Sequence, residues 1–187
     1  MNVTLQRCEA EKSTTRRKRN SLALVMALAP LLAGCFMSDA PKFQLAGAAA
    51  PFGAQARYGL YERGEDKNFS RQEMVLVKRR GDGAYEFIND KGEVVPISLH
   101  DVGNGRFVGQ SKSEKDRPGY SYLVFRVNGP EVLVYLPDCA EQDKALLARF
   151  GVEIRANDEC AIDRVADPAG LFAAVELGEP SSKMMRE

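Results

Sequence analysis

The stretch YSYLVFRVNGPEVLVYL, residues 120–136, decides the fold class of this chain. Two runs within it, 120–127 and 132–136, are rich in β-branched and aromatic residues, which favour strands. Asn128-Gly129 stands between them, and this pair between two such runs is the strongest short-range signal of a β-hairpin. The stretch therefore predicts two antiparallel strands joined by a tight turn.

Shorter runs of the same kind precede this hairpin at regular spacing. Several of them partly alternate apolar and polar residues, which is typical of strands with one buried face. Glycine-containing turns separate some of the runs, at 81–83, 89–92 and 103–105. The expected strands cover residues 58–61, 74–78, 85–88, 94–99 and 106–110. Six or seven such strands predict an antiparallel meander that forms a small barrel or sandwich.

Beyond residue 139 the apolar residues change to a helical period, which predicts one or two short C-terminal helices. The first is expected over 141–150, with Asp138 as a cap at its start and Gly151 at its end. The second is expected to begin at Asp167-Pro168, because aspartate can cap the first turn and proline fits its first position. Its buried face is expected to consist of Leu171, Phe172 and Val175. The predicted fold class is mainly β (α+β).

The N-terminal region has the features of a cleavable export signal. A basic block at 16–19 precedes an apolar run of twelve residues at 22–33. A membrane-spanning helix needs about 20 apolar residues, so this run is too short to serve as a stable anchor. A basic segment, a short apolar segment and small residues at its end are typical of a secretory signal peptide.

The quartet Leu32-Ala33-Gly34-Cys35 ends this region and resembles the lipobox of bacterial lipoproteins. The resemblance implies that the Cys35 sulfur receives a diacylglycerol and that a peptidase cuts before Cys35. It also implies that the new amino group is acylated, for example with palmitate, and stable anchoring does require more than one acyl chain. The alternative is a short buried helix that ends at a Gly-Cys turn.

Phe36 follows the cysteine, where an aspartate would resemble the inner-membrane retention signal of enteric bacteria. The resemblance to lipoproteins therefore implies a protein of the bacterial cell envelope, with its domain facing the periplasm from the outer membrane. In this scheme residues 1–34 are the cleaved signal peptide. Residues 35–56 are the lipidated N-terminus and a flexible tether, 57–177 are a single β-rich domain, and 178–187 are a flexible tail. Local docking of Phe43, Leu45 and Phe52 is the alternative to a fully flexible tether.

The positions of the four cysteines predict different roles for them. Cys8 lies in the segment expected to be removed, and Cys35 is the expected lipid site. Cys139 and Cys160 remain as an even pair, which predicts one disulfide in an oxidising compartment. A metal or redox pair is the alternative, but nearby ligands and Cys-x-x-Cys spacing are missing.

The charge of the processed chain argues against nucleic acid as a partner. Residues 35–187 contain 20 basic and 24 acidic side chains, which gives a formal charge of −4. Proteins that bind nucleic acid normally carry a basic patch or stripe. The lipid, rather than surface charge, is therefore expected to hold the protein at the membrane.

No catalytic or metal-binding constellation is recognised, and no cofactor is expected. His100 is the sole histidine, which argues against a histidine-rich zinc site and most Ser–His arrangements. A role for His100-Asp101 as a general base stays open, but a partly exposed loop histidine is favoured. Arg80-Gly81-Asp82 matches the integrin tripeptide, but a turn explains it better. The tyrosines could line a ligand cup or pack ordinarily; they are Tyr58, Tyr61, Tyr85, Tyr120, Tyr122 and Tyr135.

The lipid anchor and the missing catalytic motif together predict a membrane-anchored envelope lipoprotein. Its domain is expected to be a non-enzymatic binding or structural module. The expected partners are the membrane and another envelope protein or cell-wall component. Two alternatives stay open: a β-barrel that binds a small molecule or lipid, and an enzyme that acts on an envelope polymer with His100 or a carboxylate as base.

Overall fold

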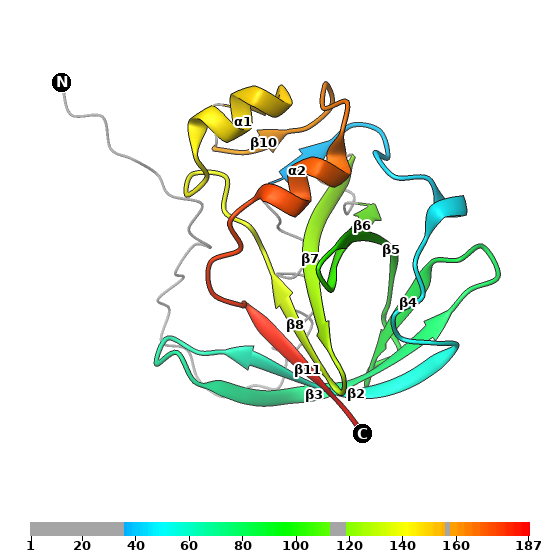
Figure 1. The fold of residues 1–187 in the computed structure, drawn as a ribbon. Helices are drawn as coiled ribbons and strands as arrows, with labels where there is room; N and C mark the ends of the chain where they lie inside the picture. Colours follow the sequence, from blue (N-terminus) through cyan, green and yellow to red (C-terminus); the bar gives the residue numbers. More distant parts are fainter. Residues whose placement is uncertain (1–35, 113–118, 156–157) are drawn as a thin grey trace, which may run out of the picture.

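The computed structural model describes residues 36–112, 119–155 and 158–187. Eight antiparallel strands form a closed barrel, and two short helices lie together at one end of the molecule (Figure 1). This confirms the predicted mainly β fold class, with a small barrel and short C-terminal helices.

Seven of the barrel strands follow one another along the chain, and each pairs with its sequence neighbour. They are β2 (Gln55–Arg63), β3 (Phe69–Arg79), β4 (Tyr85–Asn89), β5 (Val94–Gly103), β6 (Arg106–Lys112), β7 (Tyr120–Asn128) and β8 (Glu131–Tyr135). Each predicted strand overlaps one of them. The predicted hairpin joins β7 to β8, and Gly129 at its turn has a φ of 59°.

The last strand, β11 (Ser182–Arg186), closes the barrel between β2 and β8. Met184 pairs with Leu60 on one side and with Val132 on the other, and only 2% of it is exposed. The prediction of a flexible tail over 178–187 is therefore wrong. Its polar sequence forms a strand because two neighbouring strands satisfy its backbone hydrogen bonds on both edges.

Side chains fill the interior of the barrel. Alternate residues of a strand point to opposite faces, so Leu123 and Phe125 of β7 enter the interior while Tyr122 and Val124 point outward. Phe52 contributes to the same interior, where its ring lies 5.3–6.1 Å from four other aromatic rings. These rings belong to Tyr58, Tyr85, Phe87 and Phe125.

A second core lies between the outer face of the barrel and the two helices, α1 (Lys144–Phe150) and α2 (Pro168–Ala174). The caps of α2 are as predicted: the Asp167 side chain accepts from Gly170 N, and Pro168 is the first helical residue. The predicted face of α2 is buried in this core. Gly151 ends α1 in the left-handed conformation, as predicted.

The start of α1 differs from the prediction. The helix begins at Lys144 rather than at 141, and Asp143 caps it by accepting from Ala145 N at 2.8 Å. Asp138 instead accepts from Ala140 N at 2.9 Å, in the loop before the helix. Aspartate favours both kinds of site, so the sequence pattern did not separate the turn from the cap.

The segment before the barrel is packed against it. Strand β1 (Phe36–Ser38) pairs with the first residues of β7 and with β10 (Cys160–Ala161), which in turn pairs with β9 (Glu153–Ile154). Phe36 is fully buried, and the 3-10 helix η2 (Leu45–Gly47) lies further along the segment. The prediction of a flexible tether over 35–56 is therefore wrong for residues 36–56, which the structure describes. Phe36 and Phe43 pack this segment against the outer core, and Phe52 packs in the barrel interior.

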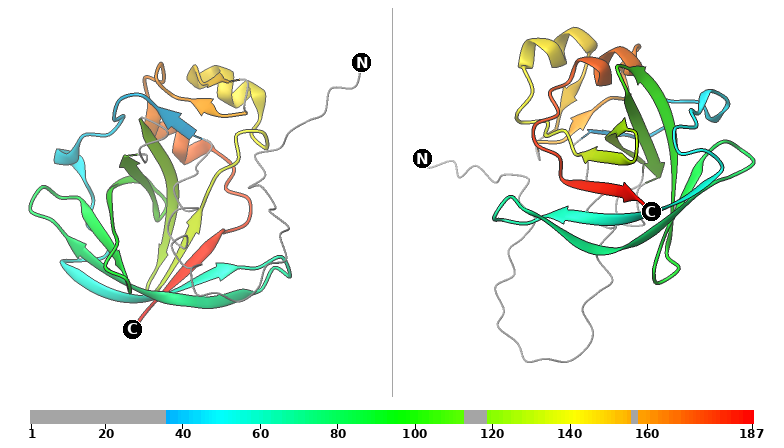
Figure 2. Two further views of the ribbon diagram at one scale, coloured as in Figure 1. Left: turned by 180° about the vertical axis from the view of Figure 1, so that it is seen from behind. Right: turned by 60° about the horizontal axis from the view of Figure 1, so that its bottom comes forward.

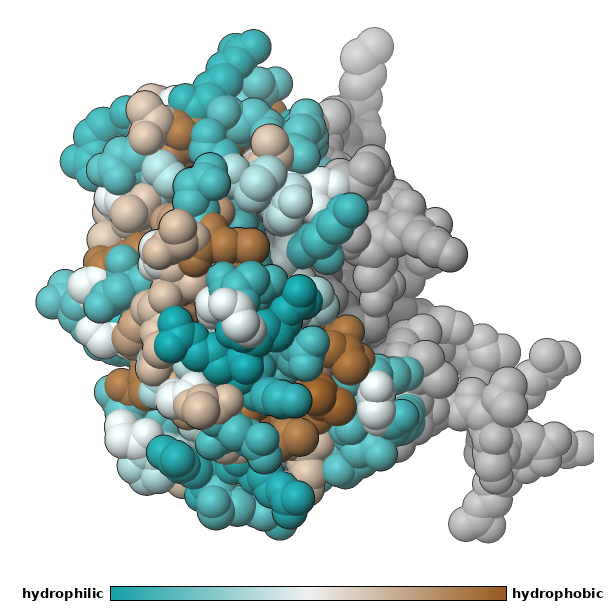
Figure 3. Space-filling model, turned by 90° about the vertical axis from the view of Figure 1, so that its right-hand side faces the viewer, coloured by the Kyte–Doolittle hydropathy of each residue, from teal (hydrophilic) through white to brown (hydrophobic). Residues whose placement is uncertain are grey.

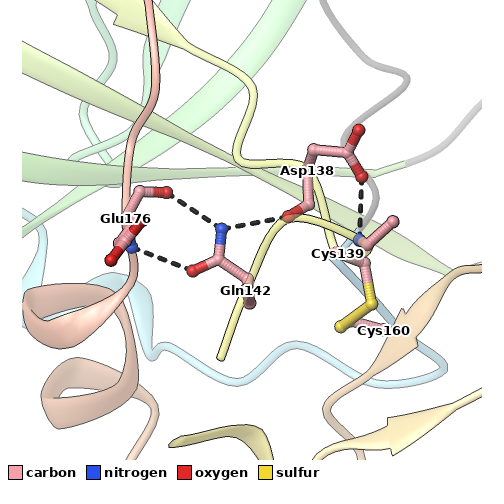
Figure 4. The surroundings of a disulfide bond; sticks show 6 residues. Asp138, Cys139, Gln142, Cys160 and Glu176 are labelled. Atoms are coloured by element: carbon pink, nitrogen blue, oxygen red, sulfur yellow. Dashed lines mark hydrogen bonds between the residues drawn. A yellow bond between two sulfur atoms is a disulfide. The ribbon is translucent and has the colours of Figure 1, made fainter. Parts of the chain in front are cut away.

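The predicted disulfide between Cys139 and Cys160 is present. It joins the loop after β8 to β10 (Figure 4). Cys160 is also the residue that pairs with Phe36 of β1. Beside it the Gln142 side chain donates to Asp138 O and Glu176 O, at 2.9 and 3.0 Å. The disulfide and Gln142 thus fix the elements that cover the outer face of the barrel.

The helices and β10 stay together at one end of the molecule when it is turned, while β2 and β3 curve across the other end (Figure 2). Among the described residues, no helix is long and apolar enough to cross a membrane.

Candidate functional site

A hollow of about 400 Å³ lies between residues 41–46 and the outer side of the barrel, where the turn between β3 and β4, strands β5 and β6 and the first residue of β7 line it. Most of its lining is apolar, with charged side chains at Arg80, Asp82 and Lys112. The face that carries the 36–50 segment shows apolar patches set among polar side chains (Figure 3). The apolar lining residues are Pro41, Phe43, Leu45, Ala46, Ala84, Pro96 and Tyr120.

Gln110 of β6 forms part of the lining and holds the segment in place. Its Oε1 accepts from the backbone N–H of Lys42 at 2.8 Å and of Phe43 at 3.0 Å. Its Nε2 donates to Phe43 O at 3.1 Å. A buried amide that satisfies three backbone groups of one segment fixes that segment against the barrel.

Tyr122 of β7 lies next to this amide. Its hydroxyl donates to Gln110 Oε1 at 3.2 Å, accepts from Lys42 N at 3.2 Å and lies 2.6 Å from Ser38 Oγ. Burial raises the pKa of Tyr122, so its hydroxyl stays protonated at neutral pH. The polar network therefore continues from β6 through β7 to β1.

His100 lies in β5 and is 5% exposed, so the prediction of a partly exposed loop histidine is wrong. The Phe43 ring stacks on the imidazole with 4.7 Å between ring centroids. Burial lowers the pKa of His100, and a hydrogen bond to the Gly47 backbone opposes part of this shift. The imidazole is therefore neutral at neutral pH.

Ser98 is the polar partner of His100 that sequence reasoning missed. Its Oγ lies 3.1 Å from His100 Nε2, and Ser98 also lines the hollow. Ser98 and His100 are two residues apart on one strand, so their side chains lie on the same face. This spacing was the signal in the sequence that could have paired them. Asp101 does not share this face: it is exposed and accepts from Gly103 N at 2.8 Å.

Arg80 and Asp82 form an ion pair at 2.9 Å at the edge of the hollow. Gly83 N donates to Arg80 O at 3.1 Å, which confirms that Arg80-Gly81-Asp82 belongs to a turn. Lys112, at the end of β6, adds a positive charge to the described lining at this edge.

The tyrosines do not line one cup. Tyr58 and Tyr85 lie inside the barrel, whereas Tyr122 and Tyr135 belong to the outer core. Tyr120 lines the hollow, and Tyr61 packs beside the Lys183 ammonium at 5.5 Å. Among these residues, Tyr120 alone is part of the hollow's lining.

Cys35 and the signal segment lie outside the described residues. Within the described part of the chain, no group of three or more histidine, cysteine, aspartate or glutamate side chains is arranged to hold a metal ion. No family model, curated protein or solved structure matches the chain.

Proposed function

We propose that the protein is an envelope lipoprotein, anchored through Cys35, whose barrel is a non-enzymatic binding module with the hollow as its ligand site. The observation that supports a binding function is the contrast between the barrel interior and the hollow on the outside of the barrel. Aromatic and aliphatic side chains fill the barrel interior, while the hollow beside Phe43 is open to solvent. A ligand would therefore bind on the outside of the barrel wall, under the 36–50 segment.

The size and lining of the hollow support this role. Ligand sites are typically about 300–1,000 Å³, mostly apolar, and contain a few fixed polar groups. This hollow has about 400 Å³, an apolar lining and polar groups at Ser98 and Gln110. Both polar side chains are held by hydrogen bonds before any ligand arrives, so the site is preorganised.

The position of β1 gives the proposed anchor a further consequence. Phe36 follows Cys35 directly and is fixed by pairing with Cys160. A lipid on Cys35 would therefore hold the barrel at the bilayer surface, without a flexible spacer of 20 residues. The proposed location remains the periplasmic side of the outer membrane.

Two variants test the two parts of the proposal separately. The Cys35→Ala variant should leave the membrane fraction, while the protein that keeps Cys35 stays in it. Ala46→Trp should fill the hollow, because Ala46 lines it and is exposed. Native mass spectrometry of the purified protein should show a noncovalent adduct that Ala46→Trp removes and the matched control Ala50→Trp keeps. An adduct unaffected by Ala46→Trp would contradict the proposed site.

An enzyme acting on an envelope polymer is the second candidate, and one observation favours it. A neutral imidazole within 3.1 Å of a serine hydroxyl is a geometry that can activate a nucleophile. Ser98 would attack an acyl carbon, His100 would take its proton and return it to the leaving group, and water would then release the acyl group. A fluorophosphonate probe should label Ser98 if this candidate holds. Absence of labelling in the folded protein, and equal turnover by Ser98→Ala, would reject it.

A further inference from the structure

We propose that the hollow binds an anionic amphiphile, meaning a single acyl chain that ends in a carboxylate or phosphate. This inference rests on the proposed binding function and names its ligand class. It draws on three separate features: the exposed apolar side chains around the hollow, the occupied polar atoms of its lining, and the sign of the charge at its edge.

Two exposed apolar side chains lie in the hollow or next to it. Among the described residues, the exposed large hydrophobic side chains are Leu45, Val94 and Ile154. Leu45 lines the hollow, and Val94 lies two residues before the lining residue Pro96 on β5. Residues two apart on a strand share a face, so Val94 extends the apolar surface beyond the hollow. An apolar ligand would cover side chains that are otherwise in contact with water.

The buried polar groups of the lining are already engaged. Gln110 uses Oε1 and Nε2 on the backbone of Lys42 and Phe43. Ser98 Oγ is bonded to His100 Nε2. A sugar or another polyhydroxyl ligand would have to break these bonds, at a cost for each buried group left without a partner. The lining therefore favours an acyl chain over a polar ligand.

The charge at the edge selects the headgroup. Arg80 and Asp82 neutralise one another in their ion pair, which leaves the Lys112 ammonium as the net charge among those lining residues that the structure describes. Lys112 is exposed at the end of β6, opposite Tyr120 of β7. A headgroup beside Lys112 stays hydrated while its chain enters the apolar hollow. A carboxylate and a phosphate both fit this description, as a free fatty acid or a phosphate-bearing lipid would supply.

The experiment uses a defined probe, 11-(dansylamino)undecanoate, titrated into the complete processed protein while its fluorescence is recorded. We expect saturable binding with a blue shift of the emission. Decanoate and decyl phosphate should displace the probe, decanol should do so at least severalfold less well, and acetate should not displace it. The relative strength of decanoate and decyl phosphate identifies which of the two headgroups the site prefers.

Matched variants assign the binding to the hollow. Ala46→Trp should weaken probe binding by at least about tenfold, and Ala50→Trp should leave it unchanged. Lys112→Gln should weaken it by about threefold, the size of one exposed ion pair, whereas Lys78→Gln on β3 should have no effect. Equal displacement by decanol and decanoate would overturn the ligand class and leave the binding function standing. If none of these chains binds but Ala46→Trp still removes the adduct seen by native mass spectrometry, the ligand class is wrong and the binding function stands. If the probe binds equally well to Ala46→Trp, the hollow is not the binding site.

Discussion

Phe43 and His100 stack ring on ring, with their centroids 4.7 Å apart and their planes inclined by 20°. Phe43 belongs to the segment before the barrel, and His100 belongs to the outer face of β5. Because Phe43 also lines the hollow, the contact that docks the segment also shapes the candidate site. The stability of this docked segment and the capacity of the hollow to bind should therefore change together.

The pH dependence of stability should report on His100. Burial lowers its pKa, so the folded protein takes up this proton less readily than the unfolded chain. The stabilising contribution is fully present above the unfolded pKa of about 6.5 and is lost as the pH falls through the lowered folded pKa. In urea unfolding, the protein with His100 should lose more stability between about pH 7.5 and pH 5.5 than the His100→Gln variant loses. Identical losses in the two proteins would contradict this assignment.

Removal of the Gln110 side chain should release the 36–50 segment. Gln110→Leu leaves the backbone N–H group of Phe43 without its acceptor, whereas the N–H group of Lys42 keeps the Tyr122 hydroxyl as an acceptor. An unsatisfied buried group costs about 1–3 kcal/mol, so the variant should lose stability and exchange the Phe43 amide hydrogen faster, with a smaller change at Lys42. Hydrogen exchange measures this directly. The control Gln72→Leu, at an exposed site on β3, should leave both amides protected. A Phe43 amide that is equally protected in Gln110→Leu would show that Gln110 does not hold the segment.

The closing strand should be essential to the barrel. Met184→Ala removes a buried side chain from the interior and should lower the free energy of unfolding by about 2–5 kcal/mol. Its neighbour Met185 is partly exposed, so Met185→Ala should cost clearly less. Denaturant titration of both variants checks this. Similar losses would mean that β11 does not present Met184 to the core.

The disulfide should stabilise the outer layer rather than define the barrel. Its cysteines are 21 residues apart, and closing a loop of that size stabilises a fold by about 3 kcal/mol. Both cysteines belong to the outer core and not to the barrel interior. The double variant Cys139→Ser/Cys160→Ser should therefore unfold at lower urea but keep its β-sheet circular dichroism. Loss of that signal in buffer would show that the barrel depends on the bond.

The barrel was largely predictable from sequence because its strands carry their own signals. The β7–β8 hairpin has Asn128-Gly129 between two β-rich runs, and both runs alternate their faces as the fold requires. The pairing of Cys139 with Cys160 followed from the number and position of the cysteines. These features depend on local pattern or on counting, which a single sequence contains.

The features that sequence reasoning missed depend on distant neighbours. Met184 lies in a polar strand that is stable because β2 and β8 pair with both of its edges. Phe36, Phe43 and Phe52 are isolated apolar residues in an alanine- and glycine-rich segment, so the sequence could only leave local docking of Phe43 and Phe52 open. In the structure Phe36 and Phe43 pack in the outer core, and Phe52 packs in the barrel interior. His100 is buried because that segment covers it. No local pattern marks such contacts, so the hollow itself was not predictable.

Intact and fragment mass spectrometry of the protein extracted from cell membranes tests whether the proposed binding module is anchored through Cys35. We expect a chain that begins at Cys35, with a diacylglycerol on its sulfur and an acyl group on its amino nitrogen. Retention of residues 1–34, or an unmodified Cys35 at the start of the extracted chain, would contradict it.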